Sequence, residues 1–247
     1  MTDKKENKYL LKKEIKNNKQ MKYRILIVLP ILVFALFSCI PGKITREDIE
    51  WSDFWWSHEP DTSKPRVLFI GNSISRGYYS AISTKLSGKA NCDRYATSRS
   101  IEDPALFRET KMAMGKYHHV VIHFNNGLHG WHLTNEQYEK GLRKYVKFLK
   151  SKKSKGCRLI YSLTTPYPSM EPGQKLDPVK NQVVMNRNRI ARKIMDENGI
   201  TVIDLYGLME PELEKYSGSK GNVHYNNEGY DRLAVRISNE ILKLIQK

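Results

Sequence analysis

The stretch Val67-Leu68-Phe69-Ile70-Gly71-Asn72-Ser73-Ile74-Ser75 decides the fold of this 247-residue chain. Its four apolar residues, Val67–Ile70, form a short run typical of a buried parallel strand. The run stops at Gly71-Asn72-Ser73 and a helix-like segment follows, which puts the hydroxyl of Ser73 at the carboxyl end of a strand. Open α/β sheets bind their ligands at those carboxyl ends. A lone Gly-x-Ser is also a common turn, in which the serine would only cap the next helix.

Strand-like and helix-like segments alternate along the rest of the chain, a pattern that predicts a parallel sheet with helices on both faces. One expected helix places Val183, Ile190 and Ile194 on a single apolar side and ends at Asn198-Gly199. The strands that we expect are five: Arg66–Ile70, Cys92–Ala96, Val120–Phe124, Arg158–Leu163 and Thr201–Asp204.

The first residues have the composition of an export signal. A basic start at Met21–Arg24 precedes the apolar stretch Ile25–Phe37, which is too short to span a bilayer because about 20 apolar residues are needed. The stretch ends in Leu36-Phe37-Ser38-Cys39, which resembles the lipobox of bacterial lipoproteins, where the cysteine carries lipid. We therefore expect residues 1–38 to be a signal segment, with Met21 as an alternative start, and the protein to be exported and anchored through Cys39 to a bacterial membrane, in the periplasm or at the cell surface. A plain signal peptide or an uncleaved anchor is the alternative.

The remaining chain divides into a short extension and one domain. Residues 39–64 are interpreted as a tether and an N-terminal extension rich in aromatic residues, which either pin it to the domain or stack on sugar rings. Residues 65–247 are enough for a single buried domain. Cys92 and Cys157 open expected strands, and we expect buried unpaired thiols there rather than a disulfide.

The net charge of +16 narrows the classes of partner. Residues 1–38 hold nine Lys/Arg and three Asp/Glu, which leaves +10 on the part that follows. A basic surface favours an anionic partner or a membrane face, and an acidic polysaccharide fits this charge. The sequence has no helix-turn-helix, zinc-ligand spacing or aromatic RNA-binding motif, so we expect no nucleic-acid partner, no metal and no cofactor.

Four segments carry the polar residues that could do chemistry. Besides Gly71-Asn72-Ser73, they are Ala96–Ser100, Ile122–Gly130 and the loop Gly221–Asn226, which precedes an amphipathic terminal helix. The last contains His224. A serine early in a chain and a histidine late is one order in which a nucleophile and its general base can meet in space.

Together the four segments resemble the sequence blocks of the SGNH (GDSL-type) hydrolase superfamily, and the resemblance covers most of residues 65–247. It implies a three-layer α/β/α, flavodoxin-like fold around the five-stranded parallel sheet. The run Asn125–Gly130 resembles exported bacterial members found near polysaccharide-degrading enzymes. The implied function is a serine esterase that deacetylates a polysaccharide or oligosaccharide. The alternatives are a lipase-like or thioesterase-like acyl hydrolase, and a non-catalytic carbohydrate-binding lipoprotein on a decayed hydrolase domain.

The resemblance also implies roles for individual residues. Ser73 would be the nucleophile and His224 the general base. The oxyanion hole would consist of the backbone amides of Ser73 and Ser98 and the side-chain amide of Asn125, with Asn126 as the alternative to Asn125.

Three further residues flank these blocks. Arg99 and Arg76 could hold a carboxylate of the substrate, or could be solvated surface residues. His129 would either line the pocket or brace its loop, and bracing is the first expectation.

One departure from the family pattern concerns the histidine block. The family has an aspartate three residues before the histidine, and this chain has Gly221 there. Without a carboxylate the imidazolium loses a charge partner, and loss of the correct tautomer costs orders of magnitude in turnover. Three interpretations stay open: a backbone carbonyl orients His224, another carboxylate reaches it, or the protein binds without catalysis. We favour a working hydrolase.

Overall fold

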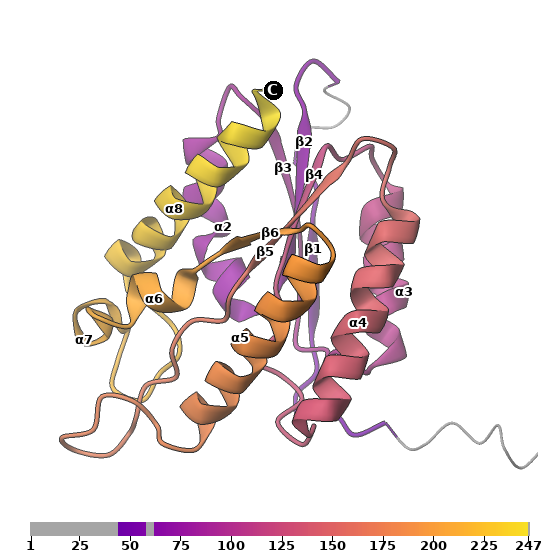
Figure 1. Cartoon of the computed structure of the whole chain (residues 1–247). Helices are drawn as coiled ribbons and strands as arrows, with labels where there is room; N and C mark the ends of the chain where they lie inside the picture. Colours follow the sequence, from indigo (N-terminus) through magenta and orange to yellow (C-terminus); the bar gives the residue numbers. More distant parts are fainter. Residues whose placement is uncertain (1–43, 58–61, 247) are drawn as a thin grey trace, which may run out of the picture. The chain divides into compact units, whose positions relative to one another are not determined.

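A computed structural model describes residues 44–57 and 62–246 of the chain (Figure 1). The expected signal segment and Cys39 lie outside these ranges. No helix within them is long and apolar enough to cross a membrane. The unit that starts at Thr45 contains all the helices and strands described below.

A six-stranded sheet forms the centre of this unit, with the strand order β1-β3-β2-β4-β5-β6. Strands β2 to β6 are mutually parallel, which confirms the expected α/β class. The sheet has one strand more than expected, because β1 pairs antiparallel with β3 at the edge. The strands are β1 (Ser52–Trp55), β2 (Arg66–Gly71), β3 (Asn91–Thr97), β4 (Val121–Phe124), β5 (Arg158–Ser162) and β6 (Thr201–Ile203).

Helices cover both faces of the sheet and enclose two apolar cores. Helices α2 and α8 lie together on one face, and α3, α4 and α5 cover the other (Figure 1). Two short helices, α6 and α7, precede α8. The helices are α2 (Ser73–Lys85), α3 (Pro104–Gly115), α4 (Asn135–Lys152), α5 (Lys180–Glu197), α6 (Leu205–Met209), α7 (Leu213–Tyr216) and α8 (Asn227–Ile245).

Helix α5 buries a different side from the one that the apolar pattern predicts. Val183 and Ile190 are only half-buried, and the buried side runs instead through Val184, Arg187 and Ile194. An arginine in the buried row breaks the apolar periodicity, which is why the pattern was misleading. The two cysteines agree with expectation, since Cys92 and Cys157 are buried free thiols.

Residues Arg46–Ser57 contribute to the sheet rather than only resting on it, and we refer to this segment as the strap. Its strand β1 pairs with β3, and the ring of Phe54 stacks on Tyr95 with the centroids 4.7 Å apart. Phe54 thus helps to fasten the extension to the domain. The part of the strap that precedes β1 reaches the loops at the carboxyl ends of β3 and β4, the same edge of the sheet at which β2 delivers Ser73.

Candidate active site

Ser73 is the first residue of α2, and its hydroxyl faces His224. The side chain of Asn72, not that of Ser73, caps the helix by accepting a hydrogen bond from the Ile74 amide at 3.0 Å. The serine hydroxyl is therefore free of the capping role. Its Oγ lies 2.9 Å from His224 Nε2, and both side chains are half-buried. The structure thus brings together the two residues 151 positions apart that the sequence proposed as nucleophile and base.

Asn222 orients His224 in place of the family's aspartate. The Oδ1 atom of Asn222 accepts a hydrogen bond from the His224 backbone amide at 3.0 Å and lies 2.7 Å from His224 Nδ1. Because the backbone amide can only donate, Oδ1 rather than the NH₂ group faces the imidazole. Nδ1 therefore carries the proton, and Nε2 accepts from the Ser73 hydroxyl. This is the tautomer that a general base at Nε2 requires.

A left-handed turn at Gly221 sets up this arrangement. Gly221 has φ +70°, a backbone conformation that side chains disfavour, and an added Cβ would lie 2.2 Å from Met170 Cγ. An aspartate at the family's position would therefore be strained here. The sequence left open what orients His224, and the answer is a neutral amide two residues before it. The signal for it was the Asx-turn spacing between Asn222 and His224.

The surroundings of His224 favour its neutral form. Partial burial and the positive charge of Arg76 lower the pKa of His224 below its usual value. No carboxylate among the described residues lies within ion-pair distance of this imidazole, whose polar partners are Asn222 and Ser73. The histidine is thus available as a base down to mildly acid pH, but the imidazolium formed during catalysis has no charge partner.

The backbone amide of Ser73 is a free donor at the start of α2. The first amides of a helix have no partner within it, and the positive end of the helix dipole favours an anion there. The Ile74 amide is used by the Asn72 cap, whereas no described atom accepts from the Ser73 amide. Its N–H is therefore available to a substrate carbonyl oxygen that becomes an oxyanion when Ser73 Oγ attacks.

Asn125 is committed to the interior. Its Nδ2 donates to the Ser162 carbonyl at 2.8 Å and to Thr164 Oγ1 at 3.2 Å, which uses both of its N–H groups. Asn125 also lines an internal cavity of about 10 Å³ together with Asn72. It is therefore not the free oxyanion donor that we expected first.

Asn126 fits that role better. Its Nδ2 donates one hydrogen bond, to the Arg99 carbonyl at 3.0 Å, which leaves the second N–H free among the described contacts. This bond links the loop after β4 to the loop after β3, the two strands on either side of β2. The amide of Asn126 thus crosses the carboxyl end of β2, from which Ser73 projects.

Ser98 is not a free oxyanion donor, which corrects the expectation for its backbone amide. That amide donates to the Trp51 carbonyl at 3.1 Å, and Ser98 Oγ accepts from the Trp51 amide at 2.9 Å. The sequence did not predict that the strap would pair with the loop after β3. The Trp51 carbonyl of the strap accepts the hydrogen bond that the Ser98 amide can donate. Of the oxyanion donors expected from the sequence, two keep a free N–H among the described contacts: the Ser73 amide and the Asn126 side chain.

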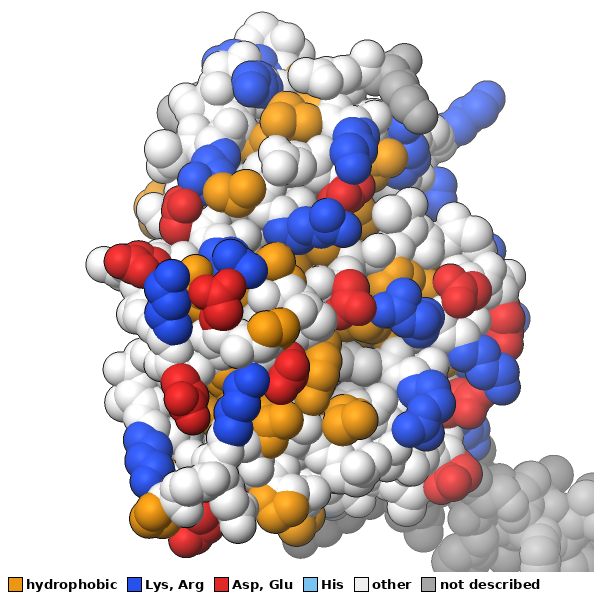
Figure 2. All heavy atoms as spheres, turned by 60° about the vertical axis from the view of Figure 1, so that its left-hand side comes forward, with side chains coloured by type: hydrophobic (Ala, Val, Ile, Leu, Met, Phe, Trp, Pro, Cys, Tyr) orange, Lys and Arg blue, Asp and Glu red, His pale blue; other side chains and the backbone are white. Residues whose placement is uncertain are grey.

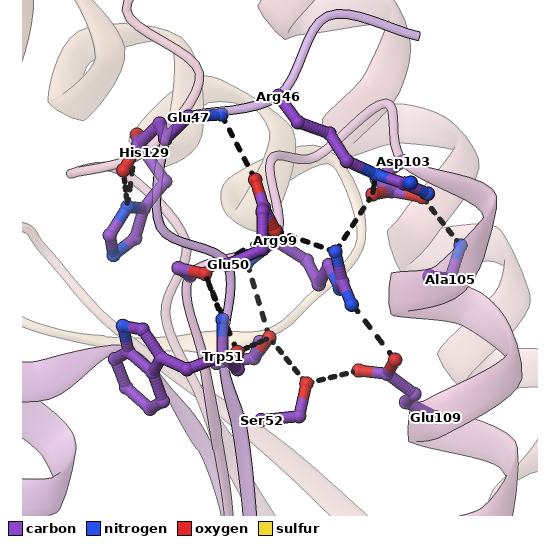
Figure 3. A network of polar contacts seen from close by, with 12 residues as sticks. Arg46, Glu47, Glu50, Trp51, Ser52, Arg99, Asp103, Ala105, Glu109 and His129 are labelled. Carbon is purple, nitrogen blue, oxygen red and sulfur yellow. Dashed lines mark hydrogen bonds and ion pairs between the residues drawn. The ribbon is translucent and has the colours of Figure 1, made fainter.

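Arg99 and His129 also face the strap rather than an open pocket (Figure 3). Arg99 Nη1 lies 2.7 Å from Glu50 Oε2, with Asp103 and Glu109 within 3.7 Å of its guanidinium. His129 Nδ1 lies 2.9 Å from Glu47 Oε2. Arg99 is thus neutralised by protein carboxylates, so the expectation that it holds a substrate carboxylate is wrong for this structure. His129 braces its loop, which was the first expectation.

Arg187 is the bracing residue that the sequence did not reveal. Its side chain is 1% exposed and donates to the backbone carbonyls of Gly127, His129 and Gly130 at 2.6 to 3.0 Å. These carbonyls belong to the loop that begins with Asn126. Three charge-assisted hydrogen bonds to one loop hold that loop in a single conformation.

A groove of about 360 Å³ lies beside the histidine loop. It runs between residues 168–175 and 213–221, and its lining includes Ser169, Lys175, Ser219 and Gly221. On the face that carries α8, acidic and basic side chains are interspersed with no large area of one sign (Figure 2). Among the described residues, no cluster of three or more His, Cys, Asp or Glu could hold a metal ion.

Comparisons with known proteins give a family match for the sequence and structural matches for the fold. A model of the GDSL-like lipase/acylhydrolase family matches residues 69–232. No curated protein sequence matches the chain. At low identity the chain shares its fold with several solved structures. The acetyl xylan esterase AlAXEase is 17% identical, with a TM-score of 0.59 over 71% of this chain and 99% of that one. A GDSL-like lipase from Bacteroides thetaiotaomicron is 16% identical, with a TM-score of 0.58 over 75% of this chain and 92% of that one. A variant of Axe2, an acetyl-xylooligosaccharide esterase from Geobacillus, is 15% identical, with a TM-score of 0.56 over 74% of this chain and 94% of that one.

Proposed function

The chain belongs to the GDSL-like lipase/acylhydrolase family and is an ester hydrolase, and from this premise we propose that it removes acetyl groups from a polysaccharide or oligosaccharide. The observation that carries the proposal is the relay Asn222–His224–Ser73, with hydrogen bonds of 2.7 and 2.9 Å and the tautomer fixed by the Asn222 amide oxygen. Two structures of similar fold are described as acetyl xylan and acetyl-xylooligosaccharide esterases, which supports acetyl as the acyl group.

The reaction follows from the chemistry of these groups. His224 Nε2 takes the proton of the Ser73 hydroxyl while Oγ attacks the acetyl carbonyl. The amide of Ser73 and the Nδ2 of Asn126 stabilise the tetrahedral oxyanion. When the C–O bond to the sugar breaks, the sugar oxygen receives the proton from His224. A water molecule, deprotonated by His224, then attacks the acetyl-serine and releases acetate and free Ser73.

Replacement of the nucleophile tests the activity. Ser73→Ala should lower the kcat for p-nitrophenyl acetate by about 10³-fold or more, because no other described group can form the acyl-enzyme. The matched control is Ser80→Ala, an exposed serine on the same helix α2. Acetate release that persists in Ser73→Ala would refute the mechanism, and no release by the wild type would favour a binding protein. Rates on butyrate and longer esters would distinguish an acetylesterase from a lipase.

The two asparagines after β4 give a second test. Asn126→Ala should reduce kcat by about 10²–10³ with little change in KM, the effect typical of a lost oxyanion donor. Asn125→Ala should mainly lower the melting temperature, because it leaves the Ser162 carbonyl and Thr164 without their buried partner. The reverse outcome, with kcat lost in Asn125→Ala alone, would assign the oxyanion donor to Asn125.

The location of the protein is a separate proposal that rests on the sequence alone. Cys39 follows an apolar stretch in a lipobox-like context, so we propose that the mature protein is lipid-anchored outside the cytoplasm. An anchored esterase of this kind would act on polymers at the cell envelope.

A further inference from the structure

Arg76 stands beside the reacting serine. It lies three residues after Ser73 on α2, and residues three apart on a helix share a face. Its side chain is exposed. The guanidinium carbon lies 5.3 Å from the centre of the Trp51 ring, which is within the range of a cation–π contact. A cation and an indole from two distant segments thus meet, and the cation is close enough to His224 to act on it electrostatically.

The charge of Arg76 is not neutralised by any carboxylate that the structure describes. No carboxylate of the described residues forms an ion pair with it, whereas Arg99 has three acidic neighbours. Arginines elsewhere in the strap region are paired as well, for example Arg46 with Asp103 at 2.9 Å. An unpaired guanidinium next to a catalytic serine is available for an anion.

In the free enzyme this charge works against the proposed reaction. A nearby cation destabilises the imidazolium that His224 becomes in the transition state, and it contributes to the lowered pKa of His224. Asn222 supplies no compensating negative charge, because an amide is neutral. A negative group of the substrate bound at Arg76 would cancel the unfavourable charge and provide the anion that the family's aspartate provides elsewhere.

Trp51 offers a fixed aromatic surface next to that charge. Its backbone is held on both sides by Ser98, through the amide and the carbonyl. In Figure 3 its indole points away from the carboxylates of the strap network. The side chain is half-buried, so part of it stays in contact with solvent. Aromatic surfaces of this kind pack against the C–H groups of sugar rings, while a guanidinium binds a carboxylate in a bidentate manner.

We propose that Arg76 and Trp51 form an anion-binding subsite and that the substrate is an acetylated sugar polymer containing uronic acid residues. The carboxylate of a uronic acid next to the acetylated sugar pairs with Arg76, and its ring packs on Trp51. This inference rests on the proposed esterase function and names its substrate class. The net charge of +10 after residue 38 is consistent with an acidic polymer as the substrate.

The test compares acetylated oligogalacturonides with acetylated xylo-oligosaccharides of similar length, measured by acetate release. The wild type should have a kcat/KM at least about 10-fold higher on the uronate, the effect of one charge-assisted hydrogen bond pair. Arg76→Gln should lose that preference, and Trp51→Leu should raise KM on both substrates. The matched control is Arg189→Gln, which removes the same charge from an exposed arginine of α5 that forms no ion pair with another described residue. The ratio of kcat/KM between the two substrates should be the same for Arg189→Gln as for the wild type.

Two outcomes separate the subsite from the activity. If p-nitrophenyl acetate is hydrolysed in a Ser73-dependent way but Arg76→Gln keeps the wild-type ratio, the subsite is refuted and the esterase stands. Binding of oligogalacturonate to the Ser73→Ala variant by calorimetry is independent of turnover. Binding should be weakened about 10-fold when Arg76→Gln is added, and equal binding by both variants would overturn the inference even if no esterase activity were found.

Discussion

Asn222 illustrates how one residue can replace half of what a carboxylate does in a Ser–His relay. Its amide oxygen accepts from Nδ1–H of His224 and so selects the tautomer and the ring orientation. A carboxylate would do the same and would also stabilise the imidazolium through its charge. The amide lacks that second effect. The site therefore has a correctly oriented base with a lowered pKa, and the imidazolium formed in the transition state lacks a charge partner.

Asn222→Asp should restore the missing charge. We expect kcat for p-nitrophenyl acetate to rise several-fold, because the carboxylate stabilises the imidazolium, with both hydrogen bonds kept. An opposite charge raises the pKa of a histidine, so the acid limb of the kcat/KM profile should move up by about one pH unit. The measurement is a pH–rate profile of the wild type and the variant between pH 4 and pH 9.

Asn222→Leu is the matched variant, of similar size but without an acceptor. It should lower kcat by roughly 10²-fold or more, since the tautomer is no longer fixed. Unchanged turnover in Asn222→Leu would show that another group orients His224. An unshifted acid limb in Asn222→Asp would show that the Asn222 side chain is too solvated to act on the imidazole electrostatically.

At the scale of elements, the sequence predicted those strands whose burial leaves a run of apolar residues. The run Val67–Ile70 is continuously apolar because β2 lies in the interior of the sheet, and all five parallel strands were predicted within two residues of their ends. Strand β1 left no such pattern. It has four residues at an edge, and the outer two of them, Ser52 and Trp55, are exposed. Short edge strands depend on a partner that the local sequence does not reveal.

The same reasoning explains which site residues were predicted. Ser73 and His224 lie at fixed positions relative to a strand end and a helix start, so local patterns located them. The roles of Ser98 and Arg99 depend on what covers them, and the strap that does so comes from residues 46–57. Arg187 was missed because its partners are backbone carbonyls. Every residue has a backbone carbonyl, so no residue type in the sequence indicates such a contact. Long-range contacts, not local propensity, determine the roles of such residues.

At the scale of the whole molecule, carboxylates fasten the strap to the rest of the unit. Burial opposes ionisation of Asp103, but hydrogen bonds from Arg46 and from the Ala105 amide outweigh it, so the pKa of Asp103 lies below its usual value. For Glu47, burial is likewise outweighed, by its contact with His129. A carboxyl group whose pKa is lower in the folded state stabilises that state above the pKa of the unfolded chain, near 4. This stabilisation is lost as the pH falls through the folded values.

We therefore expect the strap to loosen below about pH 4, with a fall in the free energy of unfolding. Three of the chain's four tryptophans, Trp51, Trp55 and Trp56, lie in the strap, so tryptophan fluorescence should report its release. Urea unfolding at pH 7 and pH 2.5 should show a loss of stability in the wild type. The double variant Glu47→Gln/Asp103→Asn should be less stable at pH 7 and should lose less free energy of unfolding on acidification, since both amides keep hydrogen-bonding ability but do not titrate.

The control is Glu171→Gln, which replaces an exposed acid without an ion pair among the described residues, and it should behave as the wild type. Parallel losses in the wild type and the double variant would show that other groups govern acid unfolding.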